Sequence, residues 1–195
     1  MRARRLWRPR LGETVSVAPV LVVRHAPVHV PGICYGQLDV PTALSANAAA
    51  AAVLEQLARD GTRITRVWTS PWRRTQGPAT RLADVLGVPL VADARLSELA
   101  FGQWEGRAYR ELDGDPAFQQ WMREWREAAP PGGERLAELV DRVRSWRAEV
   151  LSRQEAAVAL THAGVIRVLR AEARGVDYDA VAQETVQPLM LERVR

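Results

Sequence analysis

In two short stretches of the sequence, a histidine lies two residues after the end of a run of apolar residues. Residues 20–23 lead into Arg24 and His25, and residues 156–160 lead into Thr161 and His162. A third apolar run leads into Ser70, with Arg74 four residues later. Arginine presents a planar fork of donors that matches phosphate oxygens, and a neutral imidazole is a competent nucleophile toward phosphorus. These residues therefore predict phosphoryl transfer.

The same chemistry needs a proton for the leaving oxygen. Glu98 supplies a carboxyl group shortly after another short apolar run, residues 88–93. A second imidazole can donate to the equatorial oxygens of the phosphoryl group. Arg73 and Arg74 are adjacent, and neighbouring residues on a helix point about 100° apart, so only one of them can face the site. Each of these residues is weak evidence alone, but two histidines, the arginines and a glutamate at the ends of apolar runs seldom occur together by chance.

Apolar runs and helical patterns alternate along the chain. This alternation predicts a three-layer α/β fold, with a mostly parallel sheet and helices on both faces. In such sheets ligands bind beyond the carboxyl ends of the strands, so the residues above should meet at one edge. The predicted strands are residues 17–23, 64–70, 88–93, 156–161 and 186–194, and the predicted helices are residues 43–61, 71–87, 134–154 and 164–175.

The chain length predicts one domain, residues 18–195, preceded by a flexible basic extension, residues 1–17. The basic and apolar start resembles a secretory signal, but Glu13 and Pro19 interrupt its apolar stretch. Residues 95–133 break the strand–helix pattern and are locally rich in aromatic residues. We expect this segment to be a helical insert that either covers the site or forms a second packing layer.

The charge distribution argues against nucleic acid as a partner. Residues 1–13 carry five arginines and one acid, which accounts for the whole net charge of +4, so the rest of the chain is neutral. No apolar run approaches the length of a membrane span. The single cysteine, Cys34, fits a reducing compartment, and we expect a cytoplasmic protein. No feature of the sequence predicts the oligomeric state.

Four stretches resemble, in order, the motifs of the histidine phosphatase (phosphoglycerate mutase-like) superfamily. They are LVVRHAPV, VWTSPWRRTQGPATRLA, RLSELAFGQWEG and LTHAGVIRVL, and the resemblance extends over residues 20 to about 170. Within the superfamily, CYGQLDVP, FGQWEG and PPGGE are most similar to bacterial α-ribazole phosphatases of cobalamin synthesis.

The resemblance implies a role for each of the five residues singled out by their chemistry. His25 would be the nucleophile that becomes phosphorylated, with Arg24 and Arg74 as phosphate ligands. Glu98 would be the acid and base, and His162 the second histidine. The implied substrate is a small phosphorylated metabolite, and no metal or organic cofactor is needed.

Two further segments bear on the substrate. Tyr35, Gly36 and Gln37 follow the nucleophile and either contact the phosphate or leaving group or form a plain turn. In mutases of the superfamily, an arginine and a tyrosine after the acid hold phosphoglycerate. The corresponding residues here are Leu99 and Phe101, which implies a phosphatase with a larger and less acidic substrate.

Three alternatives remain beside an α-ribazole 5′-phosphate phosphatase. The first is a phosphoglycerate mutase or a broad sugar-phosphate phosphatase. The second is a binding module without turnover, although binding alone requires no acid at Glu98. The third is a zinc site with His25 and His29, whose spacing would suit a helix that Pro27 and Pro31 prevent.

Overall fold

The computed structural model describes residues 18–194 of the chain, so the predicted extension, residues 1–17, lies outside the described residues. Its centre is a five-stranded sheet with strand order β3-β2-β4-β1-β5. Neighbouring strands are parallel, except that β5 runs antiparallel to β1. The prediction of a mostly parallel sheet is confirmed. The strands are β1 (Val20–Arg24), β2 (Arg66–Thr69), β3 (Leu90–Ala92), β4 (Ala157–Thr161) and β5 (Leu191–Arg193).

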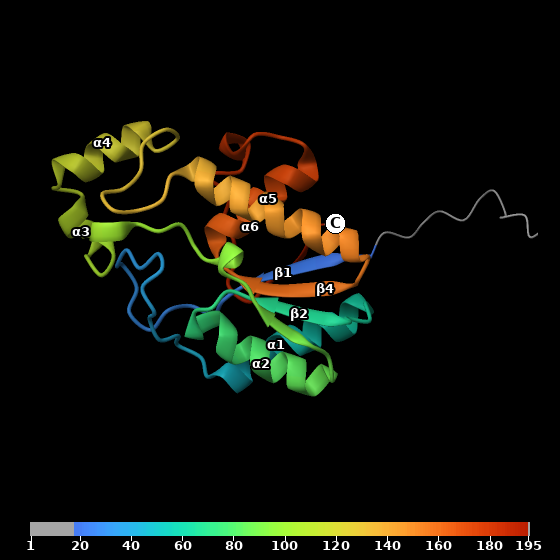
Figure 1. Cartoon of the computed structure of the whole chain (residues 1–195). Helices are drawn as coiled ribbons and strands as arrows, with labels where there is room; N and C mark the ends of the chain where they lie inside the picture. Colours follow the sequence, from blue (N-terminus) through green and yellow to red (C-terminus); the bar gives the residue numbers. More distant parts are fainter. Residues whose placement is uncertain (1–17, 195) are drawn as a thin grey trace, which may run out of the picture.

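Four long helices cover the two faces of the sheet (Figure 1). Because β1 is buried on both faces, its sequence is continuously apolar rather than alternating. Val20 and Val22 pack in the cluster that contains α5 and α6, whereas Leu21 and Val23 pack in the cluster that contains α1 and α2. The helices are α1 (Ala46–Asp60), α2 (Arg73–Leu86), α5 (Leu136–Arg153) and α6 (Ala163–Arg174).

The boundaries of the first two helices follow local capping chemistry. The Ser45 side chain accepts a hydrogen bond from the first turn of α1, and Gly61 ends that helix with a φ of 77°. The second helix starts at Arg73 rather than at Pro71, because Trp72 has extended backbone at the N-cap. Arg74 therefore lies in the first turn of α2, next to the end of β2.

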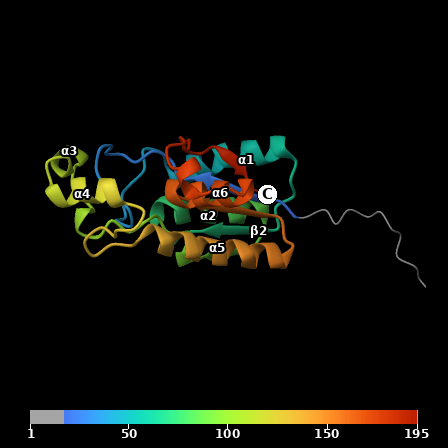
Figure 2. The ribbon, with the colours of Figure 1, turned by 90° about the horizontal axis from the view of Figure 1, so that it is seen from above.

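The aromatic segment forms a small layer of its own. It contains the 3-10 helix η2 (Gly102–Trp104) and the helices α3 (Tyr109–Leu112) and α4 (Pro116–Glu124), whereas the 3-10 helix before it, η1 (Ala94–Leu96), packs against α5. Cys34, Trp104, Leu112 and Phe118 form a separate buried cluster there. Figures 1 and 2 both place α3 and α4 beyond the end of the sheet at which β1 finishes. The predicted helical insert therefore lies on the side of the strand ends.

The last strand is shorter than its predicted range. Only Leu191–Arg193 pairs with β1, and Pro188 lies ahead of it, forming an isolated bridge with Arg24. The edge position of β5 agrees with the prediction, but Pro188 does not belong to the paired strand. No helix within residues 18–194 combines the length and the apolar character that crossing a membrane requires.

Candidate active site

The register of two neighbouring strands brings the two histidines together. β1 and β4 are parallel, and Arg24 pairs with Thr161. His25 and His162 are the next residues, so both leave the sheet at the same place. The His25 amide donates to the Thr161 carbonyl at 3.0 Å, and the two imidazole centroids lie 5.3 Å apart.

His25 is held as a neutral imidazole with one nitrogen free to react. Its Nδ1 lies 2.6 Å from the Ala26 carbonyl oxygen, which can only accept, so Nδ1 carries the proton and Nε2 keeps its lone pair. The pKa of His25 is lowered from 6.5 to about 4, chiefly by burial; the hydrogen bond to the Ala26 carbonyl opposes this shift, and the nearby Arg74 and Arg24 add to it. The side chain is therefore a nucleophile at neutral pH.

His162 is fully buried and is oriented by a serine. Its Nε2 lies 2.7 Å from the Ser70 hydroxyl, which is in turn 2.7 Å from the Thr75 hydroxyl. Burial lowers the pKa of His162 well below its usual value, and Arg74 and His25 act in the same direction. Its Nδ1 is buried without a hydrogen-bond partner among the described residues. Nδ1 is therefore the ring nitrogen of His162 that is left for a ligand.

Arg74 and Arg24 bring guanidinium groups to the same place. Arg74 is 3% exposed, and its Nη1 and Nη2 donate to the carbonyl oxygens of Leu38, at 2.7 Å, and Gly36. Arg24 donates through Nη1 to the Val186 carbonyl at 2.8 Å. The Nε atoms of both arginines are buried without partners among the described residues. A buried donor without a partner is costly, so both arginines suit an anionic ligand.

Arg73 faces away from this group, as expected for a neighbour on a helix. Its side chain is 93% exposed and lies near the Asp39 carboxylate, with a separation of 3.5 Å. The buried position of Arg74 and the exposed position of Arg73 follow from the same helical rotation.

Glu98 lies against the start of α6. Its carboxylate accepts from the Gly164 amide at 3.1 and 3.2 Å and from the Leu99 amide at 3.0 Å. A Cβ atom at position 164 would overlap the Glu98 carboxylate, so only glycine permits this approach. Gly164, two residues after His162, therefore allows the Glu98 carboxylate to lie against the start of α6.

The loop after His25 encloses Arg74 and contacts the acid. The Tyr35 ring lies 5.4 Å from the Arg74 guanidinium carbon and 6.1 Å from the His25 ring. Gly36 has a φ of 38°, and a Cβ there would collide with neighbouring groups, so the turn requires glycine. Gln37 donates to the Glu98 carbonyl at 3.0 Å. Tyr35 and Gly36 line the pocket described next, whereas Gln37 does not.

A pocket of about 530 Å³ adjoins this group of polar residues. Arg24 and Glu98 form part of its wall, and Arg167 is the only other charged residue in the described wall. The remaining wall is mostly apolar or aromatic. It includes Leu99, Phe101, Trp121, Trp125, Leu136 and Tyr178.

The structure therefore brings His25, Arg24, Arg74, Glu98 and His162 into one site at the carboxyl ends of the strands. Within residues 18–194, no group of three or more His, Cys, Asp or Glu side chains is arranged to hold a metal ion.

Sequence reasoning missed several residues of this site. Ser70 was recognised only as a strand end, although it follows β2 as the histidines follow β1 and β4. Arg167 and Tyr178 line the pocket, and nothing in their local sequence indicates this. Arg142 contacts the loop that carries Glu98, but in the sequence it looks like an ordinary polar residue of an amphipathic helix.

Comparison with known proteins identifies the family. Residues 20–195 match the family described as the histidine phosphatase superfamily (branch 1). The adenosylcobalamin/alpha-ribazole phosphatase of Escherichia coli K12 is 27% identical over 181 residues, which are 91% of this chain and 82% of that protein. Phosphoserine phosphatase 1 of Hydrogenobacter thermophilus is 27% identical over 167 residues, which are 81% and 77% of the two chains.

A solved phosphatase structure also has a similar fold. The crystal structure of the alpha-ribazole phosphatase from Shigella flexneri superposes with a TM-score of 0.77 at 24% identity and covers 89% of this chain and 88% of that one. At this identity the similarity concerns the fold. The family match extends over almost all of the described residues, and the chain belongs to the histidine phosphatase superfamily, branch 1, as an enzyme of that superfamily.

Proposed function

We propose that this enzyme hydrolyses a small phosphomonoester through a phosphohistidine at His25, and that its substrate is α-ribazole 5′-phosphate or a closely related compound. The observation that most supports this substrate is the pocket beside the site. Arg24 and Glu98 join the buried histidines and Arg74 to a neighbouring pocket of about 530 Å³ with a largely apolar, aromatic wall. The leaving alcohol of α-ribazole 5′-phosphate is a benzimidazole nucleoside, whose flat apolar base suits such a wall.

The first chemical step is attack on phosphorus by the Nε2 lone pair of His25. The bond from phosphorus to the leaving oxygen breaks as the new P–N bond forms, and Glu98 gives its proton to that oxygen. Arg24, Arg74 and His162 stabilise the charge on the three equatorial oxygens. The products of this step are the free alcohol and phosphorylated His25.

The second step is attack on the phosphohistidine by water. Glu98, now a carboxylate, takes a proton from the water as the oxygen bonds to phosphorus. The P–N bond breaks, its electron pair returns to Nε2 of His25, and inorganic phosphate leaves. Both steps use the same residues, and each returns Glu98 to the protonation state that the other step requires.

The pocket wall favours this substrate over phosphoglycerate. Leu99 and Phe101 line the pocket and replace the arginine and tyrosine that the family resemblance assigns to phosphoglycerate binding in mutases. An apolar wall cannot replace the hydration of a carboxylate, so a phosphoglycerate would lose affinity there. This argument supports hydrolysis of a larger and less acidic phosphomonoester.

A panel of substrates tests the proposed specificity. The panel contains α-ribazole 5′-phosphate, phosphoserine, 3-phosphoglycerate and glucose 6-phosphate, with release of inorganic phosphate as the measurement. We expect kcat/KM for α-ribazole 5′-phosphate to exceed the others by at least 10-fold, the low end of what apolar contacts contribute. A higher kcat/KM for phosphoserine or 3-phosphoglycerate would contradict the proposed substrate while leaving the phosphohistidine chemistry intact.

A trapping experiment tests the chemistry separately. Denaturing at alkaline pH after a few milliseconds with 32P-labelled substrate should recover label on the wild-type protein that is stable to base and lost in acid. His25→Ala should retain no label, whereas His29→Ala, which changes an exposed histidine outside the site, should be labelled normally. Equal labelling of His25→Ala would remove His25 from the mechanism.

A further inference from the structure

Arg142, on α5, is bound to the backbone of the segment that carries Glu98. Its Nη1 donates to the carbonyl oxygens of Arg95 at 2.7 Å and Ser97 at 2.6 Å. Its Nη2 donates to the Glu98 carbonyl at 3.1 Å. The guanidinium also pairs with the Glu134 carboxylate, through Nε at 2.6 Å and Nη2 at 2.8 Å. These five bonds equal the number of N–H groups in an arginine side chain.

The carbonyls of Ser97 and Glu98 depend on side chains for their hydrogen bonds. Residues 97–101 belong to no helix or strand, so no regular ladder of backbone hydrogen bonds holds this segment. The Glu98 carbonyl accepts from both Arg142 and Gln37, while its carboxylate is held by the Gly164 amide. Glu98 is thus fixed at both ends, from α5 and the Gln37 loop on its backbone side and from α6 on its side-chain side.

The ion pair with Glu134 fixes Arg142 in its turn. The two side chains are 18% and 15% exposed, and the Glu134 amide donates to the Ala100 carbonyl at 2.9 Å. Glu134 is therefore joined to the same segment two residues beyond Glu98. Because charged hydrogen bonds are stronger in such partly buried surroundings, the guanidinium is held in one orientation.

We propose that Arg142 is the positioning residue of Glu98, setting where its carboxyl group lies relative to the leaving oxygen. This inference rests on the proposed role of Glu98 as the general acid. The Glu134 carboxylate and the carbonyls of Arg95, Ser97 and Glu98 occupy all five N–H groups of Arg142, so it acts through Glu98 rather than on the substrate. A displacement of about 1 Å in a catalytic group can cost on the order of 10²-fold in rate, which gives the expected size of the effect.

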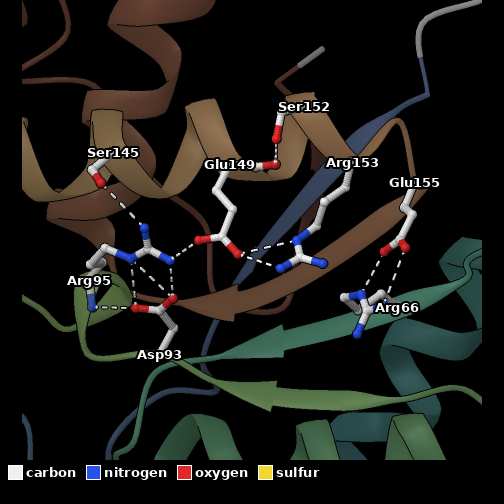
Figure 3. A network of polar contacts seen from close by, with 8 residues as sticks. All are labelled: Arg66, Asp93, Arg95, Ser145, Glu149, Ser152, Arg153 and Glu155. Carbon is white, nitrogen blue, oxygen red and sulfur yellow. Dashed lines mark hydrogen bonds and ion pairs between the residues drawn. The ribbon is translucent and has the colours of Figure 1, made fainter.

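A second arginine joins the same segment to α5 and provides a matched control. Arg95 pairs with Asp93 and with Glu149 of α5, both at 2.6 Å, and its Nη1 lies 3.3 Å from the Ser145 hydroxyl (Figure 3). Its hydrogen bonds go to Asp93, Ser145 and Glu149, and none goes to Glu98. Replacing Arg95 should therefore weaken the packing of the segment on α5 without releasing the acid.

The experiment compares two leaving groups in Arg142→Gln, Arg95→Gln, Glu98→Gln and the wild type. 2-Phenylethyl phosphate releases an alkoxide that needs a proton, whereas p-nitrophenyl phosphate releases a stable phenolate. Arg142→Gln should lose about 10²-fold in kcat on 2-phenylethyl phosphate and only a few-fold on p-nitrophenyl phosphate. Arg95→Gln should change both rates by the same factor. Adding Arg142→Gln to Glu98→Gln should cost little more, because the acid is already absent.

Removing Arg142 alone leaves the Glu134 carboxylate without its partner and could prevent folding. The double variant Glu134→Gln/Arg142→Gln removes both charges together and should show the same selective loss. Arg142→Lys keeps the charge but cannot supply all three carbonyl contacts, so its loss should be intermediate. Arg144→Gln, which removes an exposed arginine of the same helix, should behave as the wild type.

A second measurement does not depend on catalysis. The Gly164 amide donates to the Glu98 carboxylate, so its NMR chemical shift reports the position of that carboxylate. The shift should move in Arg142→Gln and in Glu98→Gln but not in Arg95→Gln. If Glu98→Gln shows no leaving-group preference, the acid role fails and this shift still decides the positioning. An unchanged shift in Arg142→Gln would overturn the inference, and so would equal losses on both substrates in Arg142→Gln when Glu98→Gln does show a leaving-group preference.

Discussion

At the scale of single residues, the reactivity of His25 follows from two contacts. The Ala26 carbonyl occupies Nδ1 and leaves Nε2 as the nucleophile, and burial keeps the ring neutral. Because Nε2 carries no proton, the imidazole needs no general base to deprotonate it before it attacks phosphorus. The nucleophile is activated by its tautomer and by its low pKa, which is the opposite of a hydroxyl that needs an adjacent base.

We therefore predict that the phosphoryl group in the trapped intermediate is attached to Nε2 of His25. Two-dimensional 15N NMR of the phosphoprotein distinguishes the two nitrogens. In the free enzyme, the His25 ring signals should show a neutral imidazole throughout pH 5.5–8, because the pKa is about 4. A titration near pH 6.5, or phosphorylation on Nδ1, would contradict the assignment of the tautomer.

At the scale of secondary-structure elements, helix rotation selects the arginine that serves the site. Arg74 is buried beside Tyr35 and the histidines, and Arg73 is exposed beside Asp39. The two residues are chemically identical and adjacent in the sequence, so any difference between their variants reports geometry. The N-cap at Trp72 sets this phase, because α2 begins at the next residue, Arg73.

Replacing the two arginines in turn tests the phase of α2. Arg74→Ala should lower kcat on any phosphomonoester by about 10³-fold, as loss of an electrostatic clamp on the phosphoryl group does. Arg73→Ala should remain within a few-fold of the wild type. Circular dichroism and thermal unfolding of both variants control for folding, and a larger loss in Arg73→Ala would show that the phase is wrong.

At the scale of the whole molecule, the buried histidines make the fold sensitive to acid. The pKa values of His25 and His162 are lowered in the folded state, so between pH 6.5 and about 4 the unfolded chain binds more protons than the folded one. Stability is therefore complete above pH 6.5 and is lost progressively as the pH falls through this window. Burial that keeps the two imidazoles neutral therefore makes the folded protein less stable at low pH.

Urea unfolding at pH 7 and pH 5 measures this coupling. His25 alone should reduce the unfolding free energy of the wild type by about 2 kcal/mol between these pH values. His25→Gln should show a loss smaller by that amount, and His29→Gln, at an exposed position, should match the wild type. At pH 5 most carboxylates remain ionised, so ion pairs contribute little. Equal losses in all three proteins would contradict the buried, neutral state of His25.

The sequence by itself determined the fold class and indicated the five residues whose chemistry suits phosphoryl transfer. Continuous apolar runs indicate strands buried on both faces, and residues that follow parallel strands must gather at one edge. His25, His162 and Arg74 could be identified in this way because their positions depend on local pattern. Their catalytic roles stay predictions, as do the residues 1–17 extension and the cytoplasmic location.

Only the tertiary structure decided which contacts control these residues. The order β2-β4-β1 places Ser70 and His25 on either side of His162, although the three are far apart in the chain. The Arg142 contacts with the Glu98 segment span 44 residues, and the pocket wall joins segments from Arg24 to Pro188. Such contacts depend on which helices, strands and loops pack together. The apolar pattern of one element shows which of its faces is buried but does not show which other element covers that face.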